Sequence, residues 1–141
     1  MPRGDDDIRL VDTSVAVALS VADHEHHERT AERLTGRKLG LAGHAAFETF
    51  SALTRLPPPA RRHPVTVARL IETNFPHTRH LDPAVASRLF AQLAPAGIAG
   101  GAVYDALVGA TAQQHDLTLI TRDGRASRVY RALGVRFETI D

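Results

Sequence analysis

Four acidic residues stand at positions where a small packed domain has little structural use for a carboxylate: Asp12, Glu48, Asp105 and Asp123. Each borders or interrupts an apolar run, and apolar surroundings make a charged carboxylate costly unless a cation or hydrogen-bond donors compensate. If folding brings the four together, each close pair of like charges costs about 4 kcal/mol at an effective dielectric constant near 20. A divalent cation is the simplest compensation, and oxygen ligands favour Mg²⁺ or Mn²⁺ over Zn²⁺.

The composition limits the remaining possibilities. The chain has 141 residues and a formal net charge of +1, so charge alone indicates no partner. The absence of cysteine excludes disulfides and thiolate metal sites. The longest weakly charged stretch, residues 11–22, is too short to span a bilayer, and no apolar signal segment opens the chain. We therefore expect a cytoplasmic protein made of a single domain, residues 1–141, in which residues 1–7 form a solvated tail.

Three local features allow more than one interpretation. The basic tract at residues 55–63, with Arg61 and Arg62, could meet phosphates or could be an ordinary exposed loop. His24 and His27 could share a helix face, but no third metal ligand accompanies them, so we expect a solvated helix there. Tryptophan is absent and aromatic residues are sparse, which argues against an aromatic platform for stacking bases.

The hydrophobic pattern predicts short apolar strands that alternate with helices. Thr13 or Ser14 is expected to cap the first helix and Asp23 the second, because their side-chain oxygens can accept an unpaired backbone N–H. Strands are predicted at residues 8–11, 39–42, 77–81, 118–121 and 135–139, and helices at 13–21, 24–34, 44–55, 64–75, 83–93, 103–115 and 126–133. This alternation favours an α/β fold with a central parallel sheet of about five short strands and helices on both faces.

Such a sheet would gather the carboxylates at one edge. Ligands of open α/β sheets bind beyond the carboxyl ends of the strands. Asp12 and Asp123 each follow a predicted strand, and Asp105 begins a helix that should face the same edge. Glu48 can reach this edge only if its helix packs across the mouth of the site. The sequence therefore predicts one acidic site.

Each carboxylate also has an ordinary structural explanation. Asp12 could simply cap the helix that follows it, and Asp123 before Gly124 is a good turn pair. Asp105 could interact favourably with the positive end of a helix dipole, and Glu48 alone could face solvent.

Four segments, in order along the chain, are similar to those of a known family. They are residues 10–14 (LVDTS), the helix that carries Glu48, residues 100–107 (GGAVYDAL) and residues 119–123 (LITRD). In these segments the chain resembles PIN-domain ribonucleases, and most of all VapC-type toxins of type II toxin–antitoxin systems. Many relatives carry a further acidic or Asn residue soon after the last aspartate, whereas residues 124–127 (GRAS) contain none. The resemblance therefore carries over four acidic residues rather than five.

The resemblance implies a three-layer PIN-like fold and a metal-dependent endoribonuclease that hydrolyses RNA and leaves a 5′-phosphate. In that case Asp12, Asp105 and Asp123 hold Mg²⁺ or Mn²⁺, and Glu48 orients the attacking water or helps to hold a second ion. The neighbouring hydroxyls would hydrogen-bond the carboxylates or metal-bound waters; they belong to Thr13, Ser14 and Thr121. The implied partners are RNA, a small cognate antitoxin that blocks the acidic pocket, and a second copy of the chain in a homodimer.

Other function classes are less compatible with the sequence. A haloacid-dehalogenase-like phosphatase would need a second aspartate two residues after Asp12, where this chain has Ser14. A PIN-like RNA-processing nuclease without an antitoxin would use the same residues. A non-catalytic PIN scaffold is also possible in principle, but the presence of all four carboxylates argues against it.

Overall fold

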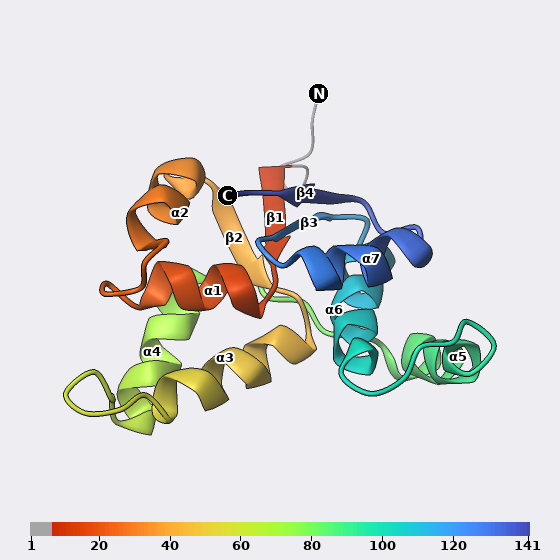
Figure 1. The fold of residues 1–141 in the computed structure, drawn as a ribbon, viewed down its shortest axis with the longest axis horizontal. Coiled ribbons are helices and arrows are strands. Elements are labelled where there is room, and N and C mark those ends of the chain that lie inside the picture. The colour runs from red at the N-terminus through yellow and green to blue at the C-terminus, as the bar shows by residue number, and fades with distance from the viewer. Residues whose placement is uncertain (1–6) are drawn as a thin grey trace.

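The computed structural model describes residues 7–141 and contains a four-stranded parallel sheet flanked by helices (Figure 1). The expected tail at residues 1–7 lies outside the described residues except for Asp7, which is exposed. The strands are β1 (Ile8–Val11), β2 (Lys38–Leu41), β3 (Thr118–Thr121) and β4 (Phe137–Thr139). The helices are α1 (Thr13–Ser20), α2 (His27–Leu34), α3 (His44–Thr54), α4 (Pro64–Asn74), α5 (Pro83–Leu93), α6 (Ala102–Gln114) and α7 (Gly124–Ala132).

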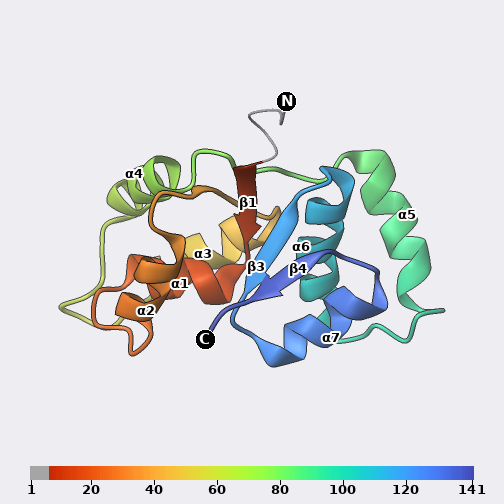
Figure 2. The same ribbon diagram turned by 90° about the horizontal axis from the view of Figure 1, so that it is seen from above.

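Strand β1 lies inside the sheet, whose order is β2-β1-β3-β4. Leu10 pairs with Gly40 on one side and with Leu119 on the other, in parallel register. Because β1 and β3 are parallel neighbours, the residues that follow them, Asp12 and Arg122, emerge at the same edge. Helices α1, α2 and α4 lie toward one end of the molecule, and α5, α6 and α7 lie toward the other (Figure 2).

The predicted fifth strand, residues 77–81, is wrong in detail. Within the described part of the chain this segment makes one isolated bridge, between Arg79 and Ala42, at the outer edge of β2. The backbone N–H of Leu41 donates to the Thr78 hydroxyl at 2.9 Å. This side-chain oxygen takes the place of a backbone carbonyl, so a regular ladder does not form.

Several helix starts also differ from the prediction. Asp12, rather than Thr13 or Ser14, caps α1, because its side chain accepts from the backbone N–H of Val15. Asp23 does not cap α2, which begins only at His27, because turns occupy the residues before it. Helix α7 begins at Gly124, two residues earlier than predicted, because Asp123 accepts from the backbone N–H groups of its first turn.

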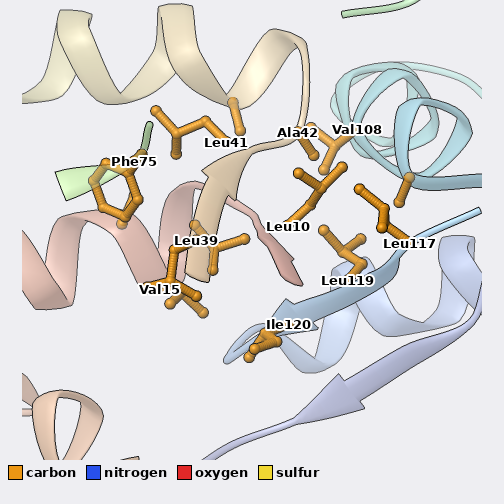
Figure 3. Packing of buried hydrophobic residues seen from close by; sticks show 14 of the residues in the cluster. Leu10, Val15, Leu39, Leu41, Ala42, Phe75, Val108, Leu117, Leu119 and Ile120 are labelled. Carbon is orange, nitrogen blue, oxygen red and sulfur yellow. The ribbon is translucent and has the colours of Figure 1, made fainter. Parts of the chain in front are cut away.

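The core surrounds the two inner strands. Leu10, Val11, Leu119 and Ile120 have no exposed surface, as expected for strands covered on both faces. Figure 3 shows Leu10 and Leu119 facing side chains from the neighbouring helices, among them Val108 of α6. No helix in the described part of the chain is long and apolar enough to cross a membrane. The packed strands therefore form a rigid base for the residues that follow them.

Gly40 permits the close approach of the residue 77–79 segment to β2, and this provides a test of the packing. A Cβ atom at Gly40 would lie 2.2 Å from both the carbonyl carbon and the oxygen of His77. We expect Gly40→Ala to lower the free energy of unfolding by about 1–3 kcal/mol, the usual cost of overpacking. The measurement is urea denaturation followed by circular dichroism.

Gly124→Ala is the matched control for this substitution. A Cβ atom at Gly124 meets nothing within 4 Å, and the residue opens a helix. This variant should be as stable as the parent protein or slightly more stable. Equal stability of the Gly40→Ala variant and the parent would contradict the close contact.

Candidate functional site

Asp12 lies at the carboxyl end of β1 and is held by donors from several elements. Its side chain is only 4% exposed. Oδ1 accepts from the Ser14 hydroxyl at 2.5 Å and from the backbone N–H of Val15 at 3.4 Å. Oδ2 accepts from the Tyr130 hydroxyl at 2.9 Å. Burial raises the pKa of Asp12, while the donated hydrogen bonds oppose this shift and favour the charged form.

Two hydroxyls connect Asp12 to the end of β3. The Ser14 hydroxyl, which donates to Asp12, also accepts from the backbone N–H of Arg122 at 3.0 Å. The Thr121 side chain makes a further hydrogen bond that favours ionised Asp12, and it accepts from the backbone N–H of Asp123 at 3.0 Å. Ser14 and Thr121 therefore connect Asp12 to the residues that follow β3.

Glu48 reaches this edge because α3 packs across it. Glu48 Oε2 accepts from the Thr13 hydroxyl at 3.2 Å. Glu48 Oε1 lies 3.1 Å from His44 Nε2, one helical turn earlier. The two contacts fix the carboxylate from both sides, and Thr13 is the third supporting hydroxyl predicted from the sequence.

Asp105, in the first turn of α6, lies close enough to the other three carboxylates for their charges to affect its pKa. Its pKa is raised from 3.8 to about 6, first by burial and then by repulsion from Asp123, Asp12 and Glu48. Arg125 acts in the opposite direction and lowers it. Four carboxylates that are far apart in the sequence therefore share one electrostatic environment.

Asp123 combines this position with a structural role. Its Oδ1 accepts from the backbone N–H of Arg125 at 2.9 Å and of Ala126 at 3.3 Å. Asp123 therefore caps α7, just as Asp12 caps α1. Both residues therefore cap a helix, as the structural explanation predicts, and both also belong to the acidic cluster.

The donor set of the cluster suits a hard divalent cation, although no closed cage is present. Among residues 7–141, no group of three or more His, Cys, Asp or Glu side chains is placed to hold a metal ion. The neighbouring carboxylates contribute to the raised pKa of Asp105, and a bound cation would offset this repulsion. Mg²⁺ keeps several waters and needs only one or two carboxylates, so an open oxygen-rich site fits its chemistry.

An open cavity of about 590 Å³ adjoins the acidic cluster. Glu48 and Asp105 belong to its lining, together with residues of α3 and α6 that include His44, Phe47, Arg55 and Tyr104. This volume lies within the range of about 300–1,000 Å³ that is usual for small-molecule pockets.

Two aromatic residues of this region could not be singled out from the sequence. Tyr130, the donor to Asp12, is fully buried, and its position in α7 looks like that of any core residue. Tyr104 is 50% exposed instead of packed in the core, and its ring stacks on His44 at 4.9 Å between centroids. The only signal in the sequence was the position of Tyr104 directly before Asp105.

The basic tract divides into separate environments. Arg55 lines the cavity beside Glu48, whereas Arg61 Nε donates to the backbone carbonyl of Leu56 at 2.8 Å. Arg62 lines a different hollow, between the end of α1 and α4. Of these three arginines, Arg55 alone lines the cavity beside the acidic cluster.

The histidines before α2 serve local structure. The ring of His27 contacts the carbonyl of Ala18 at 2.9 Å, and His24 Nδ1 accepts from the backbone N–H of His26 at 3.1 Å. The predicted shared helix face is wrong, because His24 precedes α2.

Comparison with known proteins identifies the family and the relatives to which this chain is similar. A model of the PIN domain matches residues 9–132. The chain is similar to ribonuclease VapC27 of Mycobacterium tuberculosis, with 43% identity over 125 residues, covering 89% of this chain and 91% of that protein. It is similar to ribonuclease VapC40 of the same species, with 45% identity over 130 residues, covering 92% and 96%. The solved structure of VapBC2 from Rickettsia felis, bound to a DNA fragment from its promoter, matches with a TM-score of 0.67 and 14% identity, covering 95% of this chain and 99% of that one.

The raised pKa of Asp105, caused first by burial and then by repulsion, predicts a pH-dependent gain in stability for Asp105→Asn. Between the ordinary pKa of 3.8 and the folded value of about 6, the folded state binds more protons than the unfolded state. Stability therefore falls as the pH rises through this range, and the penalty is fully present above it. Without added metal, the variant should melt at a higher temperature than the parent near pH 7.5, and the difference should vanish near about pH 4.

Thermal unfolding at several pH values in EDTA measures this difference. Asp116→Asn is the control, since Asp116 is exposed and its ion pair with Arg136 lies at the surface. An Asp105→Asn gain that is equally large at acidic pH would show that repulsion is not its source.

Tyr130→Phe tests the hydrogen bond to Asp12. The substitution keeps the ring and removes a donor to a buried charged group, which is worth about 1.5–3 kcal/mol. We expect a loss of unfolding free energy of this size near pH 7.5, measured by urea denaturation in EDTA. Tyr104→Phe, at the exposed tyrosine, should change stability by less than about 0.5 kcal/mol. Equal effects of the two substitutions would contradict the assigned role of Tyr130.

Proposed function

This chain belongs to the PIN domain family, and on that premise we propose that it is an endoribonuclease that hydrolyses RNA with the help of Mg²⁺ or Mn²⁺. The relatives named VapC ribonucleases, at 43% and 45% identity, support the ribonuclease activity. The single observation that carries the proposal is that Asp12, Glu48 and Asp123 all lie close enough to Asp105 for their charges to raise its pKa. These carboxylates come from four separate segments and gather at the edge of the sheet where parallel α/β folds bind ligands.

In this proposal Asp12 and Asp105 hold the principal cation, and Asp123 contributes directly or through a water. When bound, a divalent cation shields the phosphate charge and stabilises both the attacking and the leaving oxygen. Asp12 would suit this role because Tyr130 and Ser14 hydrogen-bond to its two oxygens and fix their positions. Burial raises its pKa, and these hydrogen bonds oppose the rise. A ligand that is already oriented loses little freedom when it binds.

Glu48 is the residue we assign to the attacking water. Its carboxylate is oriented by Thr13 and His44 and lies at the boundary between the acidic cluster and the cavity. From there Glu48 would orient the water and accept a proton from it as the water attacks the phosphorus. The absence of a fifth acidic residue after Asp123 is consistent with one principal cation.

We further propose that the protein is the toxin of a toxin–antitoxin pair. The fold matches the VapBC2 structure over nearly the whole chain, and the curated relatives are VapC proteins. A small antitoxin would neutralise the activity by covering the acidic cluster, which is open on the side of the cavity. A cytoplasmic location and a homodimer complete the proposal.

The proposal predicts that RNA cleavage stops in excess EDTA and returns with Mn²⁺. Asp12→Asn and Asp105→Asn should each abolish cleavage, because each removes a charge from the cation site while keeping the side-chain shape. Mn²⁺ should also raise the melting temperature of the parent but not of Asp12→Asn, since a ligand that binds only the folded state stabilises it. Cleavage assays with a labelled single-stranded RNA and calorimetric titration measure these effects.

The control for both substitutions is again Asp116→Asn. Asp116 lies before β3, at the end of the strand opposite the acidic cluster, so its loss should leave cleavage unchanged. Full cleavage by the parent in excess EDTA, or by well-folded Asp12→Asn, would refute the metal-dependent mechanism.

A further inference from the structure

The cavity beside the acidic cluster combines exposed aromatic rings with a cation. Phe47 of α3 is 67% exposed, and Tyr104 of α6 is 50% exposed. Both line the cavity, and so does Arg55. The low aromatic content of the chain argues against a stacking platform, but the composition does not show where the few aromatic residues lie in the structure. The chain has seven Phe and Tyr residues in all, five and two respectively, and it exposes two of them at one cavity.

One wall of the cavity is a preorganised pair of rings. The His44 and Tyr104 rings are nearly parallel, with an angle of 16° and 4.9 Å between centroids. His44 is itself fixed by its contact with Glu48 Oε1 at 3.1 Å. Half of Tyr104 remains exposed after this stacking contact, so the ring can accept another planar group.

The residues that carry the two exposed rings are sequence neighbours of carboxylates in the acidic cluster. Phe47 directly precedes Glu48, and Tyr104 directly precedes Asp105. Neighbouring residues on a helix point about 100° apart, so each helix presents a carboxylate to the cluster and a ring to the cavity. A group that occupies the cavity is therefore adjacent to the group that the carboxylates act on.

We propose that this cavity binds one nucleobase of the RNA, the base next to the phosphodiester that is cut. This inference rests on the proposed ribonuclease function and adds a recognition site to it. The base stacks on Tyr104, against the wall that His44 supports, and Arg55 binds a neighbouring phosphate. Ser51 offers a hydroxyl to the edge of the base.

The chemistry of the lining favours an RNA base over an apolar protein segment. Besides the rings, the cavity is lined by Thr13, Ser51, Arg55 and two carboxylates of the cluster. This mixture of rings, hydroxyls and a cation suits a nucleobase, which is flat, has polar edges and is joined to phosphates, better than an aliphatic side chain. A cavity of about 590 Å³ admits a single unstacked nucleotide rather than a duplex, and RNA recognition of this kind targets unpaired bases.

The test compares Tyr104→Leu, Tyr104→Phe and Phe90→Leu. The first removes the stacking ring, and the second keeps it. Phe90→Leu makes the same kind of change at an exposed ring outside the cavity, on α5, where Phe90 is 78% exposed. The probe is a fluorescent random-sequence RNA of about 12 nucleotides. It is cleaved in the presence of Mn²⁺ under single-turnover conditions, and the cut sites are identified by sequencing.

We expect Tyr104→Leu to raise the half-saturating protein concentration on the order of ten-fold, as the loss of one stacked base requires. It should also weaken the base preference at one position beside the cut. Tyr104→Phe and Phe90→Leu should keep both properties of the parent. Parent-like affinity and base preference in Tyr104→Leu would overturn the inference while leaving the ribonuclease activity intact.

A second measurement separates this inference from the proposed function. In EDTA, titration with AMP or UMP should shift the Tyr104 ring resonances in the NMR spectrum, while those of buried Tyr130 stay unchanged. Such shifts in a protein that cuts no RNA would support the base site and reject the ribonuclease proposal. Absence of both shifts and cleavage would overturn the base site.

The same variants distinguish the competing occupants of the cavity. If a second copy of the chain fills it, Tyr104→Leu should change the mass in solution by light scattering and leave the RNA constants unaltered. If the antitoxin fills it, Tyr104→Leu should escape inhibition while cleaving RNA as the parent does. Either result would overturn the nucleobase assignment.

Discussion

The buried carboxyl group of Asp12 is the constraint around which the other elements are arranged. A carboxylate that is 4% exposed is costly unless donors surround it, and here the donors come from different parts of the chain. Ser14 belongs to α1, Thr121 to β3 and Tyr130 to α7. The hydrogen bonds that make the charge tolerable therefore also fix the positions of these elements at the edge of the sheet.

This arrangement extends into the packing of the helices. Tyr130 can reach Asp12 only because α7 lies close to α6, and Gly109 makes that approach possible. A Cβ atom at Gly109 would lie 3.0 Å from the Tyr130 ring and 3.1 Å from Val135. The same α6 carries Asp105 in its first turn, so one helix both supports the donor to Asp12 and contributes a second carboxylate. The burial of Asp105 and its repulsion from the other carboxylates both oppose this packing, and together they raise its pKa. A local loss of stability of this kind is common at functional sites.

The features that could be predicted from the sequence are those with a local cause. Apolar strands, proline at the starts of α4 and α5, and the order of elements follow from patterns within a few residues. The position of Glu48 needed a tertiary contact, and the side chain reaches the edge because α3 crosses it. Tyr130 could not be assigned, since a buried tyrosine gives no sign in the sequence of what its hydroxyl contacts. The segment at residues 77–81 failed as a strand because the Thr78 hydroxyl replaces a backbone acceptor, which a propensity argument does not include.

Under the proposed function, the cavity would couple reaction and recognition. Phe47 and Tyr104 each precede a carboxylate of the cluster on the same helix, so a rotation of α3 or α6 would move ring and carboxylate together. His44 strengthens the coupling, because it contacts Glu48 with its Nε2 and stacks on Tyr104 with its ring face. A base stacked on Tyr104 would therefore be connected to Glu48 through His44. In that case the selection of the base and the activation of the water would both depend on the position of His44.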